Sequence, residues 1–247
     1  MNTYKTAEVA AIIGVHPNTV RLYEEWEMIP KPERQANGYR VFTDFHIEQF
    51  KLARLAFQIE VLQNGLRKKM IQAVKVSATG NFDKALSLVA EYLEQLKNER
   101  TNAEEAVTLV QEILSGEIAK HSHALKRKEV SEYLNISVDT LRNWEMNGLL
   151  TVKRKENGYR VYMDSDIRRL KIIRSLRCAN YSLEAILQML LQLSKNANID
   201  IQNALNTPKE NTNIIAVCDK LISSLFAAEN NALKIITMLE EMKVKFS

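Results

Sequence analysis

Two long segments of the chain carry apolar residues at an alternating spacing of four and three positions. The first covers residues 82–114 and the second covers residues 214–246. Arg100 is the single departure from this pattern in the first segment. A heptad spacing sustained over this length is typical of helices that pack as coiled coils. We therefore expect one long helix in each segment.

Each long segment follows one copy of a repeated sequence. Thr19-Val20-Arg21-Leu22-Tyr23-Glu24 corresponds to Thr140-Leu141-Arg142-Asn143-Trp144-Glu145 at an offset of 121 residues. Asn37-Gly38-Tyr39-Arg40-Val41-Phe42 corresponds to Asn157-Gly158-Tyr159-Arg160-Val161-Tyr162 at an offset of 120 residues. Self-similarity of this kind predicts two copies of one structural module.

The beginning of each copy predicts two short helices joined by a tight turn. In the first copy, Val9, Ile12 and Ile13 fall on one helical face, and Gly14 follows as a stop signal. Pro17 suits the first turn of the next helix, where its missing N–H is not needed. This arrangement predicts a helix-turn-helix, although a generic helical hairpin fits this part of the pattern equally well.

The second half of each copy favours the helix-turn-helix. The Asn-Gly pairs at 37–38 and 157–158 are typical of tight turns, and the residues after them alternate as a short strand does. Asp44 and Asp164 then stand where another helix begins. A hairpin in this place is a wing, whose Arg and Tyr side chains can reach the sugar-phosphate backbone.

Positive charge is concentrated in the two copies. The net charge of the chain is only +4, but residues 1–76 carry 11 positive and 8 negative side chains, and residues 119–190 carry 14 and 8. The intervening residues 77–118 carry 3 positive and 8 negative side chains. Two separate basic blocks are what two modules that bind a polyanion would show.

Other kinds of chemistry are not indicated by the sequence. No apolar run approaches the roughly 18 residues that cross a bilayer, and Glu8 interrupts the apolar stretch near the N-terminus. We expect a cytoplasmic, nucleoid-associated protein. Cys178 and Cys218 lie far apart, and His121 and His123 lack clustered ligands, so no metal and no cofactor are expected. Because no nucleophile–base cluster or phosphate-binding glycine loop occurs, we do not expect an enzyme.

The repeated residues resemble the MerR family of bacterial transcription regulators. That family carries Thr-Leu-Arg-Tyr-Tyr/Trp-Glu in a helix-turn-helix, followed by a wing with Asn/Ser-Gly-Tyr-Arg-x-Tyr. The second copy matches closely, including residues 181–186 at the start of its next helix, and the first copy matches nearly as well. The aromatic residue that follows the Arg in the family is replaced by Leu22 and by Asn143. Glu27 stands where the second copy has Gly148.

The resemblance implies which residues contact DNA. Recognition helices usually meet base edges with their N-terminal residues, and wings contact the backbone. For the wing tyrosines, packing onto their own domain is an alternative that is compatible with DNA contact. The expected DNA-binding residues are Asn18, Thr19, Arg21, Tyr39, Arg40, Asp139, Thr140, Arg142, Asn143, Tyr159 and Arg160.

The resemblance also implies a use for the long helices. In the family, two subunits pair such helices antiparallel, whereas this chain holds both. We expect a mainly α fold with two winged helix-turn-helix domains, each followed by a long helix, and the two long helices pairing as an antiparallel coiled coil. The winged domains are expected at 1–76 and 119–195. The long helices and their connectors are expected at 77–118 and 196–247, with residues 115–125 joining the two halves.

The expected function is regulation of transcription by a single-chain pseudo-dimer. It would bind an asymmetric inverted repeat in double-stranded DNA and distort promoter DNA, which involves RNA polymerase indirectly and no membrane. Self-association through the long helices stays open. Asn18, Val20 and Leu22 are expected to face DNA in one copy, against Asp139, Leu141 and Asn143 in the other. The helical spacing of Val20 with Tyr23, and of Leu141 with Trp144, also predicts that these side chains face back toward the first helix of their module. Asn favours adenine and Asp favours cytosine, so the half-sites would differ.

Two other functions fit parts of the sequence. Excisionase-like recombination or DNA-architectural factors use similar winged modules, but the long paired helices count against this alternative. A helical adaptor that has lost DNA binding is the other alternative, and Leu22 is its best support.

Overall fold

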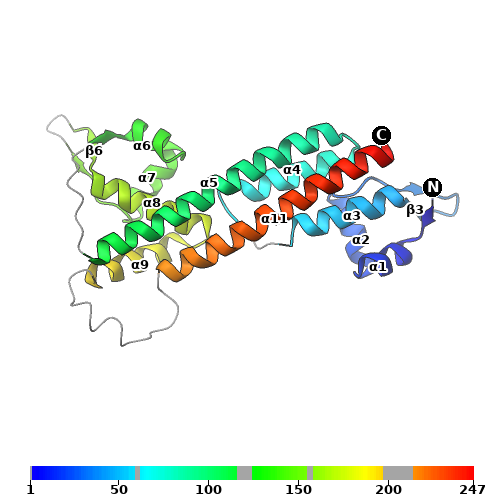
Figure 1. The fold of residues 1–247 in the computed structure, drawn as a ribbon, viewed down its shortest axis with the longest axis horizontal. Helices are drawn as coiled ribbons and strands as arrows, with labels where there is room; N and C mark the ends of the chain where they lie inside the picture. Colours follow the sequence, from blue (N-terminus) through cyan, green and yellow to red (C-terminus); the bar gives the residue numbers. More distant parts are fainter. Residues whose placement is uncertain (1, 59–61, 116–123, 155–157, 197–213) are drawn as a thin grey trace. The chain divides into compact units, whose positions relative to one another are not determined.

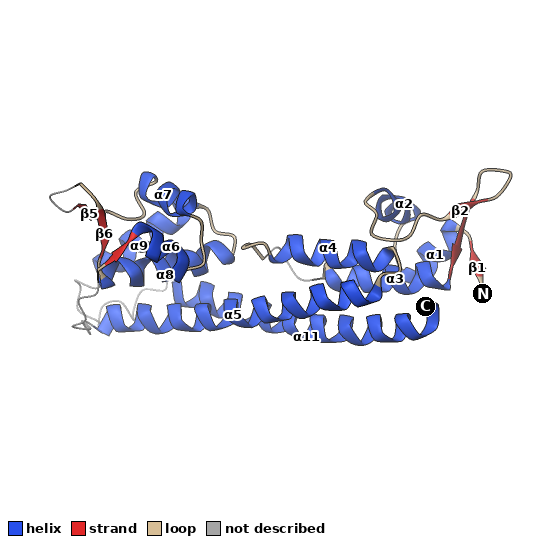
Figure 2. Ribbon diagram, turned by 90° about the horizontal axis from the view of Figure 1, so that it is seen from above, coloured by secondary structure: helices blue, strands red, loops and turns tan. Residues whose placement is uncertain are grey.

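The structure is a computed structural model that describes residues 2–58, 62–115, 124–154, 158–196 and 214–247. It confirms the mainly α fold, with long helices and two small antiparallel sheets (Figures 1 and 2). Most of the expected connector at 115–125, with His121 and His123, lies outside the described residues, as does Asn157. Within the described part of the chain, no helix is both long enough and apolar enough to span a bilayer.

The chain forms two compact units, and neither is one continuous stretch. The first unit comprises Met1–Val61, Gly65–Lys97 and Ser224–Ser247, and the second comprises Leu62–Asn64 and Asn98–Ser223. Each unit therefore contains one winged module and a part of both long helices. The four-part division along the chain stays a prediction.

The first unit contains the first helix-turn-helix and its wing. Gly14 ends α1 in the left-handed conformation, with φ of 72°. The His16 side chain caps α2 by accepting a hydrogen bond from the N–H of Asn18 at 3.2 Å, and Pro17 occupies the first helical position. Its elements are β1 (Thr3–Tyr4), α1 (Thr6–Ile13), α2 (Pro17–Glu25), β2 (Glu33–Arg34), β3 (Arg40–Thr43), α3 (Asp44–Ala56), α4 (Leu66–Ala78), and parts of α5 (Phe82–Ser115) and α11 (Ile214–Phe246).

The second unit repeats this order with different capping residues. Asn135, with φ of 50°, ends the first helix where the first copy has Gly14. The Ser137 hydroxyl caps α7 by accepting a hydrogen bond from the N–H of Thr140 at 3.0 Å. Its elements are β4 (Leu125–Lys126), α6 (Arg127–Tyr133), α7 (Val138–Met146), β5 (Lys153–Arg154), β6 (Arg160–Tyr162), α8 (Asp164–Cys178), α9 (Leu183–Asn196), and the remaining parts of α5 and α11.

Each wing belongs to a three-stranded antiparallel sheet. The strand orders are β1-β3-β2 and β4-β6-β5. Arg34 pairs with Arg40 in the first wing, and Arg154 pairs with Arg160 in the second. The wing strands were predicted, whereas β1 and β4 were missed because a strand of two residues has no alternation to detect.

The helix-turn-helix packs onto α3 in the first unit. Val9, Val20 and Phe50 are fully buried there, and the Tyr23 ring stacks on Phe50 at 4.3 Å. The prediction that Ile12 shares the buried face is wrong, because its side chain is 49% exposed. Ala10 is buried beside Val9, so the apolar stripe of α1 is turned toward Ala10 and away from Ile12.

The long helices pair antiparallel, as predicted. In the first unit, Phe82 at the start of α5 and Phe246 at the end of α11 both contact the Phe45 ring. Lys243 and Asp83 form an ion pair at 2.5 Å between the same two ends. In the second unit, the other ends of the helices share one core. That core includes Ala106, Leu109, Val110, Ile214, Val217 and Cys218.

The helix α5 is buried more widely than its heptad stripe predicts. Ala85, Leu88 and Tyr92 are buried on a second and adjacent face, whereas Leu86 and Leu93 of the predicted stripe are only half-buried. In the second unit, Ala106 and Leu109 belong to the same core as the winged module. This helix therefore supports a winged module and pairs with α11 at the same time.

Candidate nucleic-acid interface

The two recognition helices, α2 and α7, present corresponding exposed side chains. Asn18, Arg21 and Leu22 are exposed on α2, and Asp139, Arg142 and Asn143 are exposed on α7, while Thr19 and Thr140 are half-buried. Val20 and Leu141 are fully buried, which agrees with the prediction that they face back toward the first helix, so the expectation that they face DNA is wrong. Both side chains point into the core of their own module.

Hydrogen bonds along these helices orient two of the polar side chains. On α2, Arg21 Nη1 donates to Asn18 Oδ1 at 3.3 Å. On α7, the Asn147 amide donates to Asn143 Oδ1 at 2.5 Å and to the Asn143 carbonyl at 2.8 Å. In each module the side-chain oxygen of one Asn, Asn18 or Asn143, accepts a hydrogen bond, so the N–H groups of that amide remain as donors.

The tip of each wing carries an exposed tyrosine. The side chains of Tyr39 and Tyr159 are 69% and 72% exposed. In the first wing, Gly38 adopts φ of 82°, and Asn37 Oδ1 accepts a hydrogen bond from the N–H of Tyr39 at 3.1 Å. The left-handed conformation requires glycine-like freedom at the turn. The turn therefore presents the ring of Tyr39 outward.

The wing arginines are held by glutamates of the recognition helices. Arg40 Nε lies 2.5 Å from the Glu24 carboxylate, and Arg160 Nε lies 2.9 Å from the Glu145 carboxylate. The glutamate side chains are only 11% and 7% exposed. Each pair therefore ties the wing to its recognition helix. Sequence reasoning missed this role, although a glutamate ends both copies of the motif.

The second wing has additional contacts at this junction. Arg127 Nη2 lies 2.8 Å from the Glu145 carboxylate, and the Tyr162 hydroxyl donates to the same carboxylate. Burial, with the nearby Glu145 carboxylate, raises the pKa of Tyr162 to about 12, so the hydroxyl keeps its proton. Phe42 stands in the place of Tyr162 in the first copy and lacks a hydroxyl.

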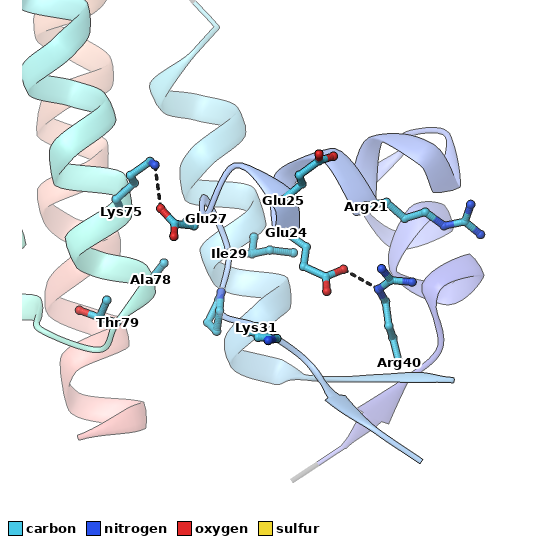
Figure 3. A pocket seen from close by; sticks show the side chains of 11 residues that line it. Arg21, Glu24, Glu25, Glu27, Ile29, Lys31, Arg40, Lys75, Ala78 and Thr79 are labelled. Carbon is cyan, nitrogen blue, oxygen red and sulfur yellow. Dashed lines mark hydrogen bonds and ion pairs between the residues drawn. The ribbon is translucent and has the colours of Figure 1, made fainter. Parts of the chain in front are cut away.

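A groove lies beside α2 in the first unit (Figure 3). Glu27 adopts φ of 60°, where the second copy has Gly148 with φ of 75°. Its carboxylate forms an ion pair with Lys75 Nζ at 2.9 Å. The groove is lined by charges of both signs, namely Arg21, Glu24, Glu25, Glu27, Lys31, Arg40 and Lys75, with Ile29, Pro30, Ala78 and Thr79.

The cysteines are placed for packing. Cys178 and Cys218 are buried thiols. Burial raises the pKa of Cys178 to about 12 and that of Cys218 to about 11, which keeps both protonated. Within the described ranges, no three or more His, Cys, Asp or Glu side chains gather as a metal site would require.

Comparison with known families agrees with this geometry. Residues 4–77 and 125–193, more than half of the chain, match the family described as MerR HTH family regulatory protein. The chain belongs to the MerR family. It therefore carries two tandem MerR-type modules, and the residues of both recognition helices and both wings fall within the matched segments.

Individual relatives match over a short segment. The chain is 38% identical to the HTH-type transcriptional regulator CueR of Escherichia coli O6:H1 over 53 residues, which is 22% of this chain and 39% of CueR. It is 36% identical to ZntR of Escherichia coli K12 over 63 residues, which is 25% of this chain and 45% of ZntR. It is also 36% identical to AdhR of Bacillus subtilis over 61 residues, which is 24% of this chain and 44% of AdhR. Each match spans less than half of the relative. No solved structure is significantly similar to this chain.

Proposed function

We propose that this MerR-family chain is a transcription regulator that binds double-stranded DNA through two different reading heads. A reading head is here the helix-turn-helix and wing of one unit. The observation that carries the proposal is the repeated geometry. Each head presents an exposed arginine on its recognition helix, an exposed tyrosine on its wing, and a partly buried Glu–Arg pair that joins the two.

The charges of the heads suit the two parts of a DNA interface. Arg21 and Arg142 are exposed near the N-terminal halves of the recognition helices, the part that usually enters the major groove. Tyr39 and Tyr159 would contact sugar and phosphate from the wings, and their exposure supports this role. Arg40 and Arg160 contribute chiefly by positioning the wings, because a carboxylate already neutralises each guanidinium.

We further propose that one chain acts as a pseudo-dimer. The antiparallel pairing of α5 and α11 supports this, because Leu225, Ile235 and Leu239 on the predicted stripe of α11 are buried without a second chain. Sedimentation at micromolar concentration should give a monomer of 28.3 kDa. A tight dimer that exchanges the long helices would contradict the proposal.

The heads differ at the positions that would read bases, which supports an asymmetric site. Asn18 corresponds to Asp139, and Leu22 corresponds to Asn143. Selection of bound duplexes from a random pool should recover an imperfect inverted repeat. A perfectly symmetric selected site would contradict this part of the proposal.

The regulator is proposed to act by distorting promoter DNA, as family membership suggests. Bending a DNA binding site costs on the order of 1–6 kcal/mol, and contacts from the two heads can offset this cost. A bend assay on the selected site should show slower migration when the site lies at the centre of the fragment. Equal migration at all positions would exclude bending.

The decisive test of DNA binding is removal of the two exposed arginines. Arg21→Ala combined with Arg142→Ala should abolish specific binding, and each single change should weaken it. Lys234→Ala is the matched control, because Lys234 is an exposed cation on α11 outside both heads. If the double variant binds as tightly as the control, Arg21 and Arg142 do not carry the interface, and if the parent chain and the control show no specific binding, the adaptor function is favoured.

A further inference from the structure

The recognition helix of each head carries an outward row of three side chains spaced by four residues. The row on α2 is Asn18, Leu22 and Trp26, and Trp26 follows the last helical residue with its N–H donating to the Leu22 carbonyl at 2.9 Å. Residues four apart lie on one face of a helix. The row on α7 occupies the same positions and consists of Asp139, Asn143 and Asn147.

The two rows differ in chemistry at their second and third positions. Leu22 is 40% exposed and Trp26 is 51% exposed, so two neighbouring apolar side chains face solvent on α2. On α7 the same two places hold amides that are hydrogen-bonded to each other. An isolated exposed apolar residue needs no explanation, but here two stand together in the row that contains Asn18.

The apolar pair is supported from beneath by the core. The Trp26 ring lies 6.3 Å from the Tyr23 ring, which in turn stacks on the buried Phe50 at 4.3 Å. Leu22 sits one residue after the exposed Arg21. Aromatic packing thus holds Trp26, and the apolar pair lies on the same exposed helix as Arg21.

The major groove offers one apolar group on its base edges, the C5-methyl group of thymine. A leucine cannot donate or accept a hydrogen bond, so it gains from base edges only by packing against that methyl. Asn143, in contrast, has its oxygen occupied by Asn147 and presents N–H donors.

We propose that Leu22 is a specificity-determining residue of the first head and packs against the C5-methyl group of a thymine in its half-site. Trp26 extends the apolar surface by one helical turn. The second head has no such contact, because Asn143 offers hydrogen-bond donors at the same place. This inference rests on the proposed function and adds the chemistry by which one head reads its half-site.

The test replaces single thymines by deoxyuridine, which removes only the methyl group. Duplexes are first selected with the full-length chain from a random pool, and each thymine of the selected site is then replaced in turn. At one thymine, in one half-site, the dissociation constant should rise about fourfold, the effect of one buried methyl-sized group. With Leu22→Ala protein the same replacement should have no effect.

Exchange of the two residues gives the matched control. Leu22→Asn should lose sensitivity to the methyl group, and Asn143→Leu should create a new sensitive thymine position in the opposite half-site. Both side chains are exposed, and a melting temperature within a few degrees of the parent chain verifies folding.

The outcomes separate this inference from the proposed function. Tight binding that is indifferent to every thymine-to-deoxyuridine replacement in the unaltered chain would overturn the role of Leu22 and leave DNA binding intact. Sensitivity that persists in Leu22→Ala would overturn it as well. If the random pool yields no bound duplex, the proposed function itself fails, and this inference fails with it.

Discussion

Arg174 on α8 and Glu99 on α5 form a buried ion pair with two parallel contacts of 2.7 Å. Their side chains are 9% and 3% exposed. Arg174 Nε also donates to the Leu134 carbonyl at 2.8 Å, and Asn64 donates to Glu99 at 3.3 Å. Because α5 follows the first winged module in the chain, this pair fixes the second head to a helix from the other copy.

Removal of one member of this pair should destabilise the second unit strongly. Glu99→Ala or Arg174→Ala leaves a buried charge without a partner, which costs about 3–5 kcal/mol. Urea unfolding can be followed by Trp144 fluorescence in a Trp26→Phe background, because Trp144 is then the only tryptophan and lies in the second unit.

The pair itself is expected to contribute little net stability. Glu99→Leu combined with Arg174→Met should cost much less than either alanine substitution, since apolar residues often replace a buried ion pair without loss, and the remaining cost comes from the lost hydrogen bonds to the Leu134 carbonyl and from Asn64. The exposed pair of Lys128 and Glu132, at 3.8 Å, is the control, and Lys128→Ala should cost less than about 1 kcal/mol. Equal losses for Lys128→Ala and Arg174→Ala would contradict the argument.

The second wing should depend on the hydroxyl of Tyr162. Tyr162→Phe recreates the composition of the first wing, which has Phe42, and should cost about 1 kcal/mol for the lost hydrogen bond to Glu145. Glu145→Ala should cost more, about 1–3 kcal/mol, because Arg127 and Arg160 also lose their acceptor. Urea unfolding followed by Trp144 fluorescence measures both losses. If the two substitutions were equally costly, Glu145 would not act as the shared anchor.

The parts of the fold that the sequence predicts are those with a repeated or periodic pattern. The long helices follow from heptads, and α2 and α7 follow from a motif that occurs twice. The strands β1 and β4 could not be predicted, because they form only by pairing with the wing strands β3 and β6. The exposure of Ile12 depends on the direction in which α1 packs, which its own apolar residues leave ambiguous.

The candidate site was predictable as a set of positions but not as a set of contacts. The motif placed Arg21 and Tyr39 on recognition helix and wing, and both are exposed in the structure. It did not reveal that Arg40 is paired with Glu24, since that contact joins residues 16 positions apart on different elements. The helical spacing correctly turned Val20 toward the first helix, whereas the expectation that the same side chain faces DNA is wrong.

Glu27 is an unfavourable residue for its backbone conformation. Its φ of 60° lies in the left-handed region, and the other non-glycine residues with positive φ in the described ranges are Asn64, Asn135 and Asn180. Asn tolerates this region better than other residues that carry a Cβ. Glu27→Asn should therefore raise the free energy of unfolding by up to about 1 kcal/mol.

The measurement must separate backbone strain from the loss of the Lys75 ion pair. The pair is exposed, with side chains 40% and 78% accessible, so it should contribute at most about 1 kcal/mol. Lys75→Ala measures that contribution alone. Urea unfolding of the first unit is followed by Trp26 fluorescence in a Trp144→Phe background. A Glu27→Asn variant less stable than Lys75→Ala would refute the strain argument.

His46 caps the helix α3 through an unprotonated nitrogen. Its Nδ1 accepts a hydrogen bond from the N–H of Thr43 at 3.0 Å, and its ring packs edge-on against Phe42 at 5.4 Å. The side chain is 7% exposed. Burial lowers the pKa of His46, against the opposing effects of the Glu24 carboxylate and the Pro30 carbonyl. The folded first unit therefore prefers neutral histidine.

This preference makes the first unit less stable in mild acid. Because the pKa of His46 is lower in the folded state than the value of about 6.5 in the unfolded chain, the unfolded chain binds a proton first as the pH falls. The contribution of His46 to stability is complete above about pH 6.5 and is lost as the pH falls toward the folded pKa. In the Trp144→Phe background, the free energy of unfolding of the first unit should fall between pH 7.5 and pH 5. His46→Gln, which keeps an acceptor at the capping position, should reduce that fall, and an unchanged pH dependence would assign it to other groups.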